Sequence, residues 1–177
     1  MYNYVCYLKK KMSNDYLVKM LSDIFEYKET SISELLNGVG HYDLRFENRQ
    51  LDDVSEFKTE LNVYILDKRK ILNLELYNNL LFGRKVAIYI KDEILINDES
   101  DDPYQWILVK EGEIFLVEEE YKDNEGINLI SSNRLELAFE KALSLLPDRG
   151  YVENKSEDET DRPYFVIPAN LWKDCVK

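Results

Sequence analysis

The chain is poor in the two residue types that most often bind zinc. Among its 177 residues there are one histidine, His41, and two cysteines, Cys6 and Cys175. Structural zinc sites take most of their ligands from these residue types. Two cysteines near opposite ends of a chain are also not the pattern of a secreted, disulfide-rich scaffold. We therefore expect no metal site, no cofactor held by such ligands, reduced thiols and a cytoplasmic location.

The sequence also lacks the long apolar runs of membrane proteins. No stretch reaches the length of about 20 apolar residues that a membrane-spanning helix requires. Three lysines, Lys9 to Lys11, follow a short mixed segment instead of preceding an apolar one, which predicts no signal peptide. Neither glycine-rich phosphate-binding motif occurs, and 38–40 is expected to form only a turn. We predict no membrane partner and no nucleotide cofactor.

Positive charge is scarce in the second half of the chain. The whole sequence has 23 Lys plus Arg against 35 Asp plus Glu, a formal net charge of -12. Residues 1–90 hold 13 of each kind, whereas residues 91–177 hold 10 basic and 22 acidic side chains. This excess disfavours a phosphate backbone as a direct ligand, and so predicts no nucleic-acid partner. The asymmetry indicates a positively charged partner, an acidic tail, or both.

Apolar residues recur at helical spacing in three segments, each of which follows a serine. Ser13 can cap the first segment, and Ser31 with Glu34 has the form of a capping box. Pro147 follows the last segment and is a typical stop. We predict helices over residues 13–25, 31–36 and 132–146.

Between these segments apolar and polar residues alternate, as they do in half-buried strands. Short polar connections at 67–70 and 110–113 are typical of hairpins, and Gly112 can supply the positive φ of a tight turn. The predicted strands are 42–46, 61–65, 72–76, 86–90, 94–96, 104–109 and 114–117. The order of elements predicts an α+β fold: an antiparallel sheet of about five to seven strands with N-terminal helices and a C-terminal helix on one face.

The last part of the chain changes character twice. Residues 153–162 contain no apolar side chain and are predicted to form a polar, acidic loop or linker. Residues 163–177 are apolar again, and we expect this segment to dock back on the body. The chain is accordingly predicted to be a single domain over 1–177.

The densest group of carboxylates before this tail lies at 98–102 and leads directly into an aromatic segment, 104–106. An EF-hand loop beginning at Asp98 would need Gly and Glu where the chain has Pro103 and Val109, so that calcium motif is excluded. The group is then either a solvated connection between strands or a carboxylate patch with an aromatic anchor for a basic partner.

Three other groups could bear chemistry. Glu118 and Glu120 would share a face of one strand, which suits a carboxylate acid/base pair but is equally typical of a solvent-facing strand. His41 could pair with a cysteine thiol, although no spacing favours this over a structural or exposed histidine. The 13 tyrosines are mostly expected in strands, with packed rings and hydrated hydroxyls.

In general character the sequence resembles the small acidic immunity proteins that bacteria encode beside toxic effectors. The resemblance rests on a compact cytosolic domain, on the acidic and aromatic segments Asp98 to Trp106 and Glu118 to Tyr121, and on the lack of a catalytic constellation. It implies a non-enzymatic inhibitor that binds a cognate protein toxin. Many such toxins are nucleases with basic grooves, which an acidic protein can occupy.

On this hypothesis the toxin meets an acidic and aromatic surface. The predicted partner-binding residues are Asp98, Glu99, Asp101, Asp102, Tyr104, Trp106, Glu118, Glu120 and Tyr121. The alternatives are an acidic nucleic-acid mimic, an adaptor domain of a larger assembly, and a carboxylate-based hydrolase that uses Glu118 and Glu120.

Overall fold

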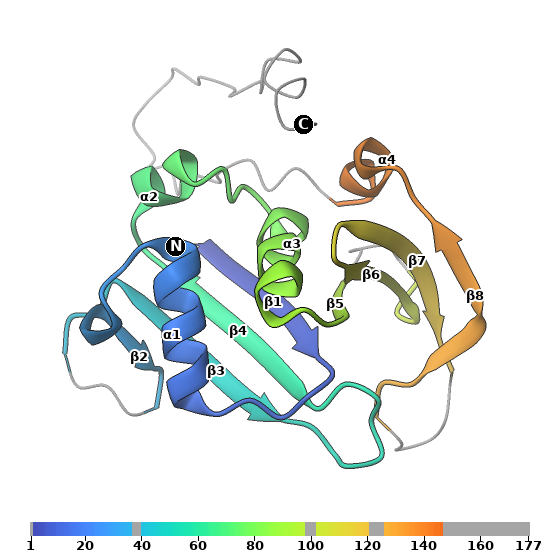
Figure 1. Ribbon diagram of the computed structural model, residues 1–177, viewed down its shortest axis with the longest axis horizontal. Helices are drawn as coiled ribbons and strands as arrows, with labels where there is room; N and C mark the ends of the chain where they lie inside the picture. The colour runs from blue at the N-terminus through green and yellow to red at the C-terminus, as the bar shows by residue number, and fades with distance from the viewer. Residues whose placement is uncertain (1, 37–39, 98–101, 121–125, 147–177) are drawn as a thin grey trace, which may run out of the picture. The chain divides into compact units, whose positions relative to one another are not determined.

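The computed structural model describes residues 2–36, 40–97, 102–120 and 126–146 (Figure 1). These residues belong to one compact unit, Met1–Pro147. The predicted linker 153–162 and the predicted docking segment 163–177 lie outside the described ranges. Within those ranges, no helix has the length and apolar character needed to cross a membrane.

The described elements are eight strands, four α-helices and one short 3-10 turn. In chain order they are β1 (Tyr2–Leu8), α1 (Asn14–Phe25), the 3-10 turn (Glu29–Ser31), β2 (Ile32–Glu34), β3 (Leu44–Gln50), β4 (Thr59–Ile65), α2 (Lys68–Asn73), α3 (Asn79–Ile90), β5 (Ile94–Asn97), β6 (Gln105–Lys110), β7 (Glu113–Glu119), β8 (Leu129–Glu136) and α4 (Phe139–Ser144).

The strands form one sheet in the order β2-β3-β4-β1-β5-β6-β7-β8. The predicted α+β class is confirmed, but the sheet has more strands than the predicted five to seven. It is also mixed, because β2 pairs with β3 in parallel while the other neighbours are antiparallel. The N-terminal segment, to which no strand was assigned from the sequence, is the central strand β1 and pairs with β4 along its whole length.

The main core lies between one face of the sheet and the helices, and Figure 1 shows α1 and α3 across that face. Three aromatic rings join the layers. The ring centroid of Tyr4 on β1 lies 5.9 Å from that of Phe25 on α1 and 4.9 Å from that of Phe82 on α3. All three side chains are buried. A second, smaller core lies on the other face, beneath β5 to β8.

Two predictions agree closely with the structure. Helix α1 begins as expected, and Ser13 accepts a hydrogen bond from the backbone N–H of Tyr16 at 3.3 Å. Its buried residues form one stripe along the helix. The hairpin of β6 and β7 is also confirmed, with Glu111 at φ 46° and Gly112 at φ 107° in its turn. Positive φ at both turn residues matches the twist of antiparallel strands.

The short helix predicted at 31–36 is wrong. Ile32 to Glu34 form β2 instead, and the N–H of Leu35 bonds to the carbonyl of Phe46 on β3 at 2.7 Å. The Glu34 carboxylate does not complete a capping box; it accepts a hydrogen bond from Asn14 on α1 at 2.8 Å. The segment pairs with β3 over three residues, and a helix of only two turns has little stability of its own, so the tertiary partner overrides the local signal.

The strands predicted at 72–76 and 86–90 are also wrong, because these segments lie in and after α2 and in α3. Each helix has a side-chain cap that the alternation of leucines and isoleucines obscured. Asp67 accepts a hydrogen bond from the N–H of Arg69 at 2.9 Å, and Asn78 accepts one from the N–H of Leu81 at 3.0 Å. Helix α3 packs so closely on β5 that a Cβ at Gly83 would lie 2.8 Å from Ile94 Cδ1.

The helix predicted at 132–146 is divided between two elements. Its first part belongs to β8, and only Phe139–Ser144 forms a helix, α4. Leu135, which was expected on the buried face of a helix, pairs with Leu116 on β7 and is 61% exposed. The prediction applied a single helical spacing of apolar residues to a segment that contains both a strand and a helix. These two elements have different spacings of apolar residues, so the prediction was wrong.

Candidate functional site

The described part of the predicted surface lies at one end of the β6–β7 hairpin, opposite its turn. We call Asp102, Tyr104, Glu118, Glu119 and Glu120 the acidic end. The carbonyl of Tyr104 accepts a hydrogen bond from the N–H of Glu119 at 2.7 Å, and Asp102 Oδ1 accepts one from the N–H of Tyr104 at 2.9 Å. Residues far apart in sequence are thus brought together.

The acidic end includes four of the nine residues predicted from the sequence. Asp102, Tyr104, Glu118 and Glu120 are all exposed, with Tyr104 at 40%. Strand β7 ends at Glu119, so Glu120 lies just beyond the ladder, and its N–H bonds to the carbonyl of Asn128 at 2.7 Å. The other predicted residues apart from Trp106 lie outside the described ranges; they are Asp98, Glu99, Asp101 and Tyr121.

Glu118 is held in place by a neutral partner. Its Oε2 accepts a hydrogen bond from Asn133 Nδ2 on β8 at 2.7 Å. Among the residues that the structure describes, neither Glu118 nor Glu119 forms an ion pair with a lysine or arginine. Two negative charges at this end of the hairpin are therefore not neutralised by described cations.

Trp106 has a different position from the one expected of an exposed anchor. It is 8% exposed, and its ring meets the edge of Tyr7 on β1 at a centroid distance of 5.2 Å. The indole Nε1 donates a hydrogen bond to Glu119 Oε2 at 2.9 Å. Trp106 belongs to the second core, so it positions the acidic end from inside, and Tyr104 is the aromatic residue at the surface.

Glu119 was not singled out from the sequence, although it is the central carboxylate of the acidic end. Burial raises its pKa, and the hydrogen bond from Trp106 only partly offsets this. The strand pattern could have predicted this position. Glu119 lies two residues after Val117, a buried residue of the second core, and side chains two residues apart in a strand lie on the same face.

Substitution of Glu119→Gln tests this description. Gln keeps the acceptor for Trp106 and removes a partly buried charge, so at pH 7 we expect stability equal to that of the wild type or higher by about 0.5 kcal/mol. Because the folded-state pKa of Glu119 is raised, its unfavourable contribution appears as pH rises through that pKa. Urea unfolding at neutral and acidic pH measures the difference, which is expected to vanish in acid. A loss above about 1 kcal/mol at pH 7 would contradict the assignment.

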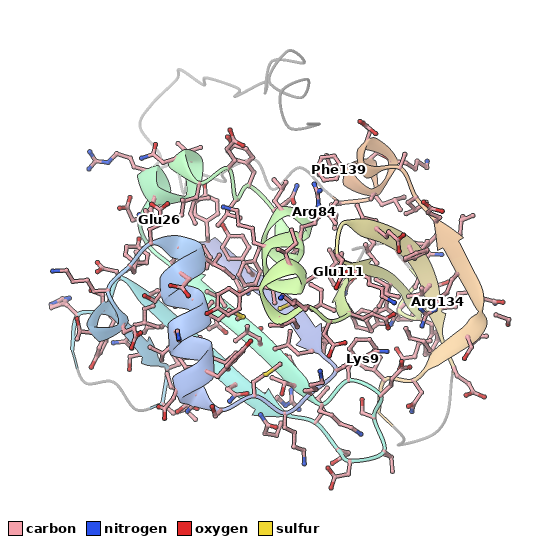
Figure 2. The ribbon with its side chains drawn as sticks, in the orientation of Figure 1. Lys9, Glu26, Arg84, Glu111, Arg134 and Phe139 are labelled. Carbon is pink, nitrogen blue, oxygen red and sulfur yellow. The ribbon has the colours of Figure 1, made fainter. Side chains whose placement is uncertain are left out.

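A buried carboxylate, Glu93, forms a second polar cluster that sequence analysis missed. Glu93 is 7% exposed and lies directly before β5. Its oxygens lie 2.5 Å from Lys9 Nζ, 3.3 Å from Arg134 Nη1 and 3.5 Å from Lys110 Nζ. Lys9 also lies 3.0 Å from Glu56 Oε1. Figure 2 labels Lys9, just after β1, and Arg134 on β8.

This Glu93 cluster lies beside the junction of β1 and β5, where two neighbouring strands share the fewest residue pairs in the described sheet. Strands β1 and β5 share only the pairs Tyr7–Leu95 and Leu8–Ile94. Through ion pairs, the cluster links Lys9, which follows β1, and Glu93, which precedes β5, to Lys110 on β6 and Arg134 on β8. Burial alone would raise the pKa of Glu93, but the hydrogen bond and charge of Lys9, with the charge of Arg134, lower it. No spacing in the sequence brings these residues together, so only the fold reveals the cluster.

The remaining chemical candidates, Cys6 and His41, differ in their exposure to solvent. Cys6 is fully buried on β1, where burial raises the pKa of its thiol far above the usual range, whereas His41 is exposed. Cys175 lies outside the described ranges. Across those ranges, no group of three His, Cys, Asp or Glu side chains is arranged to hold a metal ion.

Comparison of the chain with protein-family models, with curated proteins and with solved structures finds no match.

Proposed function

We propose that this protein is a non-enzymatic inhibitor of the immunity type, which binds a cognate basic protein toxin in the cytoplasm of the producing cell. The observation that carries the proposal is the acidic end itself. Tyr104 and four carboxylates come together there, and neither Glu118 nor Glu119 has an ion-pair partner among the described residues.

The electrostatics of the acidic end support a positively charged partner. Carboxylates on the surface steer a basic protein toward the encounter, and like charges repel acidic competitors. The net charge of -12 strengthens this long-range attraction. A basic groove built to hold nucleic acid is a surface of the required sign, so a nuclease toxin fits the proposal.

The side chains of the acidic end are proposed to contribute to binding in different ways. Tyr104 offers a large ring with a polar tip, the kind of residue that supplies affinity at the centre of interfaces. The exposed carboxylates mainly set the rate of association. Trp106 and Asn133 hold Glu119 and Glu118 in position, which lowers the entropic cost of ordering them on binding.

The rate of association provides the test. The proposal predicts that a gene beside this one encodes the toxin. Association of that toxin with the triple variant Asp102→Asn, Glu118→Gln, Glu120→Gln is expected to slow about tenfold at low salt and to depend less on salt. Stopped-flow fluorescence measures the rate. The matched control is Glu111→Gln, Glu113→Gln, Glu136→Gln, which removes the same charge at the opposite end of the hairpin and is expected to stay within about twofold of the wild type.

Inhibition of the toxin tests the function directly. Purified protein is expected to abolish the activity of that toxin at equimolar concentration, and the triple variant to need an excess. Equal rates for the triple variant and its control would exclude the acidic end as the binding surface. A neighbouring toxin that remains fully active with saturating wild-type protein would exclude the proposed function.

A further inference from the structure

The ladder between β7 and β8 is interrupted beside Glu118. Val117 pairs with Arg134 and Glu119 pairs with Leu129, so one residue on β7 faces residues 130–133 on β8. Because the two strands have different numbers of residues between these pairs, their backbones cannot stay hydrogen-bonded to each other over this segment. The chain of β8 therefore bows away from β7 at this point.

The interruption opens a shallow groove of about 240 Å³. This volume is below the usual range for small-molecule sites, about 300 Å³ or more, and suits a single side chain better. The groove is lined by three apolar residues, Leu116, Val117 and Leu135, and by five polar or charged ones. Its lining includes Gln105, Leu116, Glu118, Ser132, Asn133 and Leu135.

The two kinds of lining residue fit the two parts of a lysine side chain. Leu116 is half-buried and Leu135 is 61% exposed, so they offer an apolar wall for an aliphatic stem. Glu118 provides the charge, and Asn133 holds its carboxylate from 2.7 Å.

The charge balance of the groove also favours a cation. Arg134 borders the groove, but its guanidinium is engaged by Glu93 at 3.3 Å. Glu118 has no ion-pair partner among described residues, so its carboxylate gives the groove an uncompensated negative charge. An ammonium group beside Glu118 would form a charge-assisted hydrogen bond with its exposed carboxylate.

We propose that the groove between β7 and β8 binds one lysine side chain of the partner, with its stem on Leu116 and Leu135 and its ammonium on Glu118. This inference rests on the proposed function, because it names the group by which the basic partner is anchored. The carboxylates elsewhere at the acidic end then steer the partner, while this groove recognises a particular side chain.

The test uses the full chain, labelled with ¹⁵N, and blocked amino acids as probes. N-acetyl-lysine methylamide is titrated against N-acetyl-norleucine methylamide, which has the same stem without the charge. The lysine probe is expected to shift the side-chain amide of Asn133 and the backbone amide of Leu135, and to bind about fivefold more tightly than the norleucine probe. Glu118→Gln is expected to remove this preference. Leu135→Ser is expected to weaken both probes, and Glu140→Gln to change neither.

Other outcomes would overturn the proposal. Equal binding of the two probes would show that the groove recognises only an apolar stem. Tighter binding of N-acetyl-arginine methylamide would exclude a lysine site, and shifts confined to other amides would exclude the groove. The spectra of the variants also report whether each is folded. If the lysine probe binds as expected but the neighbouring toxin is not inhibited, the lysine site is supported and the proposed function is wrong. If Glu118→Gln and the wild type inhibit the toxin equally, the proposed function is supported and the lysine site is wrong.

Discussion

Substitution of Glu93→Gln is expected to destabilise the fold by about 3 kcal/mol. Lys9, Arg134 and Lys110 all lie within 3.5 Å of this carboxylate, and Gln would remove the negative charge that all three share. The loss is large because Glu93 is buried at a junction where β1 and β5 share only two residue pairs. Urea unfolding at pH 7 gives the free energy of unfolding.

The same variant makes a prediction about pH. The pKa of Glu93 is lowered in the folded state, so its stabilising contribution is present above the unfolded pKa and is lost as pH falls through the folded value. The difference between Glu93→Gln and wild type is therefore expected to shrink below about pH 4. Glu140→Gln, an exposed substitution, is the control and is expected to change stability by less than about 0.5 kcal/mol. A cost for Glu93→Gln no greater than this control would refute the role of the cluster.

Substitution of Phe82→Ala is expected to cost about 4 kcal/mol, the largest effect predicted. Phe82 is fully buried, and its ring lies 4.9 Å from Tyr4 and 5.7 Å from Phe25 between centroids. Removing it leaves a cavity between α3, α1 and the central strand, which rigid neighbours cannot fill. Thermal unfolding is expected to show a fall in Tm of roughly 12 °C.

The control for Phe82→Ala lies on the same helix. Ile88 is 56% exposed, so Ile88→Ala is expected to change stability by about 0.5 kcal/mol or less. Comparable losses for the two variants would mean that α3 does not pack on the sheet through Phe82.

Local signals predicted the elements that depend on neighbours in the chain. Helix α1 combines an N-cap at Ser13 with a full apolar stripe, and the β6–β7 hairpin has its turn residues between two alternating strands. In both cases the backbone groups find partners within a few residues or across a short turn. Such elements can be recognised without knowledge of the rest of the fold.

Elements whose formation depends on residues distant in the chain were predicted wrongly from the sequence. The segment 31–36 has the caps of a helix but becomes β2 because the edge of β3 is available to it. The alternation at 86–90 suits a strand, yet α3 forms because its buried residues fit against β1 and β5. Short apolar runs are compatible with either period, and packing chooses between them.

The sequence by itself determined the sign and the position of the charge, since 22 of the 35 acidic residues fall after residue 90. It also pointed to Tyr104, Glu118 and Glu120, which the hairpin register brings to one end of the sheet. Only the tertiary structure decided that Trp106 lies inside, that Glu119 is its partner, and that Glu93 holds three distant cations. The physical reason is that composition fixes the number of charges, whereas burial and pairing depend on which strands meet, and that is settled by contacts between residues far apart in the chain.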